Sequence, residues 1–426
     1  MKKLFDGIKK TLRNGPIGIY LFAGLIPLND NFLGFTVLVI ILEQLIRTIK
    51  IDKAHLSKQL SWRNPGIWLL SFYLLHVVGL IHTENMQFAT MDLGMKSTIA
   101  IFPIFFMLYK PKVVWNRFVK CFILGAFIAI AYNSFQSYLI YIETGHPHHF
   151  TGSYLSHVMH RGYWAVYLLI AYFFMLRLII AFTSKTRLLL NVFGALILGY
   201  FIVLTESRLG LIGLLIVSFW QFIVFSISIK KRWLIPVFIV VISGMFLFVY
   251  QTMPHITKRV DKTVLALKTS NQASELTPEK TDARLLLWGS SLELIKENFW
   301  FGVGTGDVKD EFVKRNKEKG YSKFVELRFN SHNQFFNVHI ALGVFGVVFL
   351  LMVFVTNILK KKEDPYRAWR LGIVFILFIA LIPESMIESQ AGIIPYAFLL
   401  SFLTAFTPVI YKTSQQELKP LEATDE

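Results

Sequence analysis

The chain has 426 residues, of which 54% are hydrophobic, and its mean hydropathy of +0.52 is too high for an ordinary soluble domain. Its net charge of +17 comes from short clusters between apolar runs, and only 17% of the residues are charged. This pattern favours a protein embedded in membrane lipids, with one basic side, over a nucleic-acid-binding protein. The single cysteine, Cys121, excludes a disulfide within the chain.

Apolar runs predict the membrane-spanning helices. A run of about 17–25 residues is long enough to cross a bilayer, and shorter runs are accepted where helix breakers flank them. Twelve spans are expected, at residues 16–28, 32–46, 66–82, 95–109, 118–141, 162–183, 188–205, 209–229, 233–252, 334–358, 368–388 and 390–410. The first follows a basic start without a cleavage site, so we interpret it as a retained span rather than a signal peptide.

The distribution of lysine and arginine predicts the orientation. The first segment, every second loop and the tail contain 27 cationic residues, whereas the intervening short loops contain only Lys96, Arg161 and Arg208. Because cytoplasmic loops are enriched in these residues, both termini are expected in the cytoplasm. The predicted organisation is nine spans in residues 1–252, an extracytoplasmic loop at 253–333, three spans in 334–410 and a cytoplasmic tail at 411–426.

The extracytoplasmic loop is expected to be partly helical. A cap followed by proline at residues 277–279 predicts a helix through Arg284 to about Glu297. Its apolar stripe consists of Leu285, Trp288, Leu292 and Ile295. A second helix is expected from Asp307 to Lys319. The Gly-x-Gly-x-Gly sequence at 302–306 predicts a turn between them, because a phosphate-binding loop needs a preceding strand and a following Lys-Ser/Thr.

Three arginines lie on the side that the positive-inside rule depletes: Arg161 and Arg208 in short connections, and Arg284 in the long loop, which contains fourteen cations. Each has a structural interpretation as an interfacial anchor, and a functional one, because a guanidinium fork suits phosphate oxygens. Arg208 lies in a turn of a few residues between two spans, where Glu206 is its nearest possible partner. One charge must therefore lie at the level of the membrane surface.

His332 and Asn333 stand where the long loop returns to the membrane. An imidazole accepts a proton near neutral pH, so His332 is a candidate base; the alternative is an interfacial histidine without a catalytic role. Nine residues later come Gly343 and Gly346, which mark a face where another helix can approach closely.

Other polar groups favour less specific interpretations. The histidines at 146, 148, 149, 157 and 160 match no zinc-binding spacing and are expected in a polar loop. Glu384 and Glu388 share a face of the eleventh predicted span. They either pair with cations of the basic loop or are interfacial carboxylates without a specific partner. The chain contains no Asp-x-Asp sequence, and we expect no metal or other cofactor.

These residues resemble the O-antigen ligase family, within the group of bacterial polysaccharide ligases and polymerases. The resemblance rests on His332-Asn333-x9-Gly343-x-x-Gly346, on Thr205-x-Ser-Arg208 at the end of a span, and on the segment from Arg284 to Gly304. Twelve spans with one large loop also fit, so the similarity covers most of the chain. It implies an all-α polytopic fold like that of GT-C integral membrane glycosyltransferases.

The resemblance also implies the reaction. Such enzymes transfer a glycan from undecaprenyl diphosphate to lipid A-core or a related acceptor at the periplasmic face of the inner membrane, without a metal. By this resemblance Arg208 and Arg284 would bind the diphosphate, Arg161 would support them, and His332 would deprotonate the acceptor; Asn333, Glu206, Gly343 and Gly346 would support the site.

Two alternatives stay open. A polymerase would join repeat units of the same carrier lipid, and a polysaccharide transporter or flippase would also have twelve spans. A transporter is expected to carry charges near the middle of the bilayer, whereas the polar residues of this chain gather at one face.

Overall fold

The computed structural model describes residues 16–28, 31–46, 59–181, 184–240, 243–244, 283–359 and 364–408. Within these ranges the fold is α-helical, apart from a parallel pair of two-residue strands, Lys112–Val113 (β1) and Thr407–Pro408 (β2). The predicted all-α class is confirmed for this part of the chain. The helical cap expected at residues 277–279 and the tail at 411–426 lie outside the described residues.

The helices of the apolar part are α2 (Ile17–Leu25), α3 (Leu33–Ile46), α5 (Pro65–Val78), α6 (Met86–Lys96), α7 (Thr98–Leu108), α8 (Trp115–Thr144), α10 (Arg161–Ile180), α11 (Lys185–Leu204), α12 (Arg208–Ser228), α18 (Gln334–Leu359), α19 (Arg367–Ala380) and α20 (Gln390–Ala405). Short elements join them: η1 (Gly79–His82), η2 (Pro147–Phe150), α9 (Gly152–Leu155) and η4 (Met386–Glu388). The polar segment before α18 contains α15 (Ala283–Glu297), α16 (Val308–Glu318) and α17 (Ser322–Glu326).

Seven helical stretches among the described residues are long and apolar enough to cross a membrane: 65–82, 86–108, 115–144, 161–180, 185–204, 208–228 and 334–359. Every predicted span contains helical residues; in 233–252 the described residues 234–240 are helical, and half of that span lies outside the described residues. The chain is therefore a polytopic membrane protein. The count of twelve stays a prediction, because α2 has only nine residues and α20 sixteen.

Two predicted boundaries are wrong. The fourth span starts at Met86 rather than residue 95, so Lys96 lies well inside it rather than at its edge, where Asp92 and Glu388 neutralise its charge at 2.7 and 3.0 Å. The eleventh span ends at Ala380 rather than 388. Glu384 consequently lies in a turn and Glu388 in η4, so these two carboxylates do not share a helical face.

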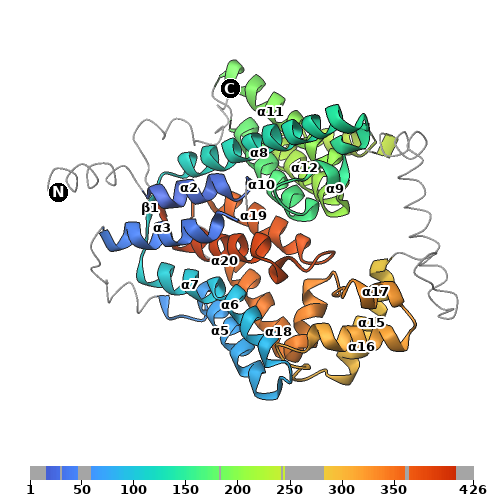
Figure 1. Ribbon diagram of the computed structural model, residues 1–426. Helices are drawn as coiled ribbons and strands as arrows, with labels where there is room; N and C mark the ends of the chain where they lie inside the picture. The colour runs from blue at the N-terminus through green and yellow to red at the C-terminus, as the bar shows by residue number, and fades with distance from the viewer. Residues whose placement is uncertain are drawn as a thin grey trace, which may run out of the picture.

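Helix α10 forms the centre of the apolar part (Figure 1). Its residues 162–171 are all buried, as expected for a helix that is enclosed on every side. It packs against α8, α11, α12 and α19, while α20 packs against α5 and α7. The outer helices instead expose large apolar side chains, such as Phe35 on α3 and Phe193 on α11, each 64% exposed. Lipid rather than water suits such surfaces.

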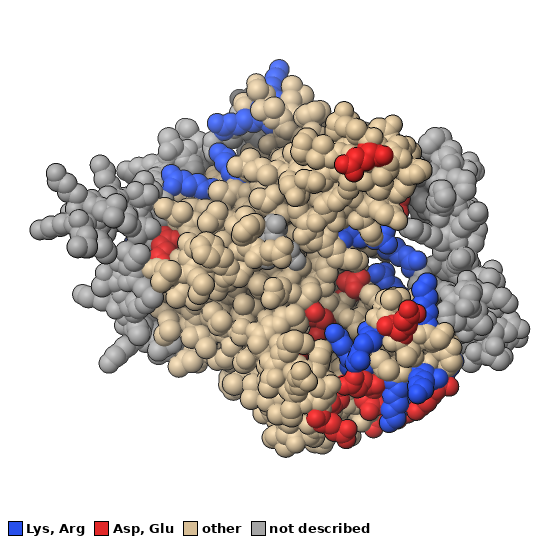
Figure 2. Space-filling model, viewed as in Figure 1, with Lys and Arg blue, Asp and Glu red and all other residues tan. Residues whose placement is uncertain are grey.

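Helices α15, α16 and α17 lie together at one end of the molecule, beside α18 (Figure 1). Acidic and basic side chains gather over these helices, whereas the wide face beside them is almost bare of charge (Figure 2). The ends of α15 and α16 agree with the predicted helices. The predicted stripe on α15 is wrong in part, because Leu292 is exposed, whereas Ser290 is buried and donates a hydrogen bond to Asn316 of α16. Hydrogen bonding between two helices thus outweighs apolarity at this contact.

A tight backbone contact joins this polar segment to α18. The Val303 and Gly304 amides donate hydrogen bonds to the carbonyls of Ile340 and Ala341, and the Val344 amide donates to the Phe299 carbonyl. Gly343 interrupts α18 with φ 65° and ψ −163°, a conformation open essentially only to glycine. A turn, not the expected neighbouring helix, therefore approaches Gly343.

Candidate functional site

A polar cavity of about 310 Å³ lies where the starts of α10, α12 and α15 meet the segment before α18. Its lining includes five residues singled out from the sequence: Arg161, Glu206, Arg208, Arg284 and His332. The other lining residues are His160, Gly162, Ser207, Leu209, Ala283, Leu287, Phe329 and Glu384. The structure thus brings together groups that are up to 171 positions apart in the sequence, from Arg161 to His332.

The turn before α12 places Arg208 at the cavity. Glu206 adopts a left-handed conformation with φ 49°, and the Ser207 hydroxyl accepts a hydrogen bond from the Gly210 amide at 3.3 Å, which caps the helix. Thr205 stabilises the turn by accepting from the Ser207 amide at 3.2 Å. The Thr-x-Ser-Arg sequence therefore fixes Arg208 as the first residue of α12.

Arg161 is the first residue of α10 and reaches the same cavity. The His160 ring nitrogen Nδ1 accepts a hydrogen bond from the Gly162 amide at 3.3 Å and caps this helix. Burial lowers the pKa of His160, which favours the neutral imidazole that such a cap requires. The Arg161 guanidinium stands 4.0 Å from the Glu206 carboxylate, a partly exposed and therefore weak ion pair.

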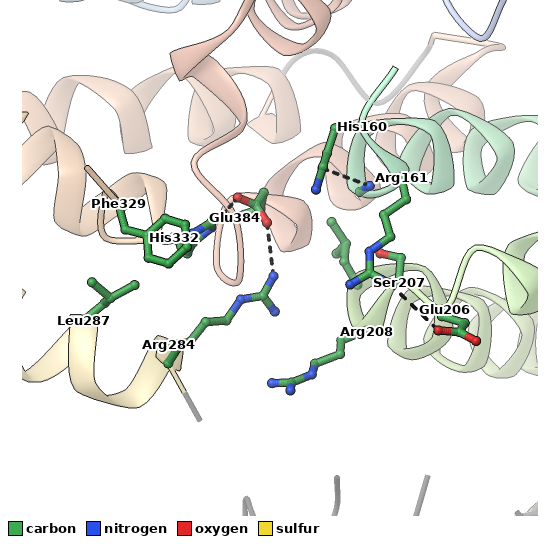
Figure 3. A pocket seen from close by; sticks show the side chains of 13 residues that line it. His160, Arg161, Glu206, Ser207, Arg208, Arg284, Leu287, Phe329, His332 and Glu384 are labelled. Atoms are coloured by element: carbon green, nitrogen blue, oxygen red, sulfur yellow. Dashed lines mark hydrogen bonds and ion pairs between the residues drawn. The ribbon is translucent and has the colours of Figure 1, made fainter. Parts of the chain in front are cut away.

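Cations at these two positions oppose the helix dipoles. The N-terminal end of an α-helix carries partial positive charge and binds anions, so arginine at its first residue is unfavourable without an anion nearby. Arg161 and Arg208 occupy this position in two adjacent helices, and Arg284 is the second described residue of α15. Figure 3 shows their side chains reaching the cavity from three separate elements. The arrangement suits a ligand with negative charge.

A carboxylate joins the histidine to one of these arginines. Glu384 accepts from His332 Nδ1 at 2.8 Å with one oxygen, and from Arg284 Nη2 at 3.1 Å with the other (Figure 3). Burial alone raises the pKa of Glu384, but the hydrogen bond from His332, its charge and the Arg284 guanidinium outweigh it and hold that pKa below its ordinary value. An ionised Glu384 selects the His332 tautomer with the proton on Nδ1, which leaves Nε2 as an acceptor.

Backbone geometry fixes the position of His332. Its φ is 46°, a conformation that is uncommon outside glycine, and its amide donates to the Asn330 side chain at 3.0 Å. The ring also lies against Phe329, with the ring centroids 5.7 Å apart. Strain of this kind persists only where the surrounding structure imposes it, and it is concentrated at functional sites.

Three of the residues expected to support the site do not line the cavity. Asn333 is buried and accepts from the Phe336 amide at 3.1 Å, so it caps α18 directly after His332. Gly343 receives the turn at residues 299–304, and Gly346 packs on Val338 and Leu342 of its own helix. Their contribution to the site is to hold α18 in place.

Of the eight lining residues that were not predicted as site residues, two are titratable: His160 and Glu384. Glu384 was assigned to the face of a continuous helix, although Pro383 beside it is a signal for the end of that helix. His160 was grouped with the histidines of a polar loop. Its position directly before Arg161, at the start of a span, was the available indication of a helix cap.

Fold and cavity together define an α-helical membrane protein with three arginines, a histidine–glutamate pair and an opening among helix N-termini. Residues 193–351, somewhat more than a third of the chain, match the family model described as O-antigen ligase, and this match supports the resemblance found in the sequence. The matched region includes Arg208, Arg284 and His332, whereas Arg161 and Glu384 lie outside it. No curated protein matches the chain.

Proposed function

We propose that this protein is a glycosyltransferase that moves a glycan from undecaprenyl diphosphate to lipid A-core or a related acceptor, without a metal. In this proposal it has twelve transmembrane helices in a GT-C-like arrangement, lies in the bacterial inner membrane with both termini in the cytoplasm, and works at the periplasmic face. The observation that carries the proposal is the meeting of Arg161, Arg208 and Arg284 with the His332–Glu384 pair in one cavity.

The arginines stabilise the leaving group. As the bond between the anomeric carbon and the diphosphate oxygen breaks, the diphosphate takes the electron pair and gains negative charge. Fixed cations and helix N-termini are the groups that stabilise such charge without rearranging at the moment of reaction. Arg208 and Arg284 bind the diphosphate oxygens, and Arg161 adds a third cation beside them.

His332 activates the acceptor. The acceptor hydroxyl attacks the anomeric carbon and gives its proton to His332 Nε2, while Glu384 accepts from Nδ1 and stabilises the imidazolium that forms. Arg284 binds the other Glu384 oxygen, so a single carboxylate joins the base to the donor site. Proton removal and departure of the diphosphate thereby take place in the same cavity.

The test is transfer by the purified protein, supplied with a lipid-diphosphate glycan and separately with lipid A-core or with a second molecule of the same lipid-linked glycan. Product on lipid A-core supports the ligase, elongation of the lipid-linked glycan identifies a polymerase, and movement of the lipid across liposomes without a new bond identifies a flippase.

Variants of His332 separate a base from an anchor. His332→Ala is expected to lose transfer but to bind the donor, because the cations that bind the diphosphate are on other elements. His332→Gln keeps a hydrogen-bonding group that cannot accept the proton, and it should be nearly as inactive. A Gln variant with most of the wild-type rate would remove His332 from the role of base.

A further inference from the structure

We propose, on the basis of the proposed function, that a second cavity binds an uncharged sugar residue of the glycan substrates. This cavity has a volume of about 440 Å³ and lies between α5, α6, α16, α18 and η4. Its size is within the range of small-molecule sites.

The two cavities share a wall. Phe329 and His332 line the first cavity, and Asn330, between them in the sequence, lines the second. The connection between α19 and α20 likewise carries Glu384, in a turn at the first cavity, and Glu388, in η4 at the second. The second cavity is therefore a polar space next to the proposed reaction site at His332. A sugar of the donor glycan or of the acceptor could occupy it during transfer.

The charges of the second cavity nearly balance. Lys96 is 3% exposed and pairs with Asp92 and with Glu388, and Lys309 supplies a second ammonium group at the lining. Among the described residues, two cations thus oppose two carboxylates at this cavity, whereas three arginines oppose two glutamates at the first cavity. The diphosphate suits the first cavity, and a neutral ligand with many hydroxyl groups suits the second.

Buried polar atoms at this cavity lack hydrogen-bond partners in the part of the chain that the structure describes. His76 is 1% exposed, and among the described residues neither of its ring nitrogens has a hydrogen-bond partner. The Asn337 side-chain oxygen is in the same situation, and this residue is 5% exposed. A buried polar group without a partner is costly. Sugar hydroxyls, which both donate and accept, would satisfy the imidazole and the amide together.

The rest of the lining suits the shape of a sugar ring. Phe88, Met91 and Met95 provide apolar surface for the carbon–hydrogen faces of a ring, while Asn330 and Gln390 add amides at the edges. A site of this kind combines apolar walls with a few convergent polar groups that fix orientation. An acyl chain would leave these polar groups unpaired.

Direct binding tests the proposal without requiring transfer. Met91 lines the cavity and is 67% exposed, so a Met91→Cys variant in a Cys121→Ser background carries one maleimide-reactive site there. Free oligosaccharide of the donor repeat unit and free core oligosaccharide of the acceptor are added separately. At ten times its dissociation constant, the bound sugar should slow labelling about tenfold, because about one site in eleven is then free.

The oligosaccharide that protects identifies whether the sugar comes from the donor or from the acceptor. A Lys314→Cys variant, on the exposed surface of α16, is the control, and its labelling rate should be the same with either oligosaccharide present. Asn337→Leu, which removes the unpartnered side-chain oxygen, should abolish protection and raise the KM for the same substrate about tenfold with a smaller effect on kcat. If Asn337→Leu fails to fold, Gln390→Ala takes its place in the test. Gln390 lies at an exposed position, and its replacement should weaken protection.

Absence of protection by both oligosaccharides, or unchanged protection in a folded Asn337→Leu protein, would overturn the proposed sugar site. Protection in a protein that transfers no glycan would instead retain this site and refute the proposed reaction.

Discussion

Replacement of Glu384 by glutamine isolates the link between the histidine and the arginine, because it removes one charge and changes little of the volume. Glu384 accepts from His332 Nδ1 at 2.8 Å and from Arg284 Nη2 at 3.1 Å. A hydrogen bond to a charged group contributes about 1.5–3 kcal/mol. Glutamine has one acceptor oxygen, so it keeps at most one of the two bonds, in a weaker neutral form, and turns its amide donor toward the other partner.

The expected loss of transition-state stabilisation is about 3–4 kcal/mol, which corresponds to a decrease of about 10²–10³ in kcat. Initial rates of glycan transfer by purified protein at saturating donor measure this decrease. Glu293→Gln is the matched control, because Glu293 is a glutamate of α15 that pairs with Arg315 and Lys319 outside the cavity. A Glu384→Gln rate within threefold of the Glu293→Gln rate, taken as about 0.7 kcal/mol, would refute a coupling of His332 through this carboxylate.

Four further predictions concern charge, pH, topology and backbone. Arg208→Ala should lower kcat/KM about 10²–10³-fold and weaken the binding of donor analogues. Arg208→Lys should recover little activity, because an ammonium does not bind two phosphate oxygens at once. Near-wild-type turnover of the Ala variant would exclude Arg208 from the donor site. The pKa of Glu384 lies below its ordinary value, so its ionised form stabilises the fold above about pH 4.3, and this contribution is lost as the pH falls through the lower folded-state pKa. Melting curves at several pH values should show that Glu384→Gln lacks this part of the acid sensitivity. The same dependence of Tm on pH in both proteins would contradict this prediction. An impermeant thiol reagent applied to intact spheroplasts should label Lys314→Cys, on the 68%-exposed side chain of α16, but not Ser228→Cys at the other end of α12; the reverse pattern would invert the topology. Gly343→Ala should destabilise the protein by at least about 2 kcal/mol, since its backbone conformation is open only to glycine and a Cβ there would collide with the backbone of Trp300; an unchanged Tm would refute this role.

Sequence reasoning located two of the arginines because they broke a rule of topology, and Arg284 because it lies on the helix predicted in the long loop. Arg161 and Arg208 were exceptions to the depletion of cations on one side, and His332 was found through a motif at the start of a span. That these groups line one cavity could not be derived from spacing, since α12 and α15 are connected through tertiary packing: α10 and α12 contact α19, and both α19 and α15 contact α18. The sequence therefore indicated chemical types, while their convergence came from the tertiary fold.

Sequence reasoning did not predict the long-range ion pairs. Glu384 is 52 positions from His332 and 100 from Arg284, and Lys96 is 292 positions from Glu388. No periodicity relates such residues. Treating 368–388 as one continuous helix also placed both glutamates on one face, although the break after Ala380 directs them to two different cavities. A correct position for that single helix end would have separated their roles.

The spacing of the histidine motif has a physical explanation in the pairing of α15 with α18. At the cavity, Glu384 joins Arg284, near the start of α15, to His332, just before α18. At the far end, the turn at 299–304 binds the backbone around Gly343.

Between these two attachments the helices pack side by side, with the rings of Trp288 and Phe336 5.9 Å apart. Ten residues of α18, from Gln334 to Gly343, cover about 15 Å. The number of residues between His332 and Gly343 therefore determines whether the far attachment and the cavity form at the same time, and so how accurately Arg284 is held against the base.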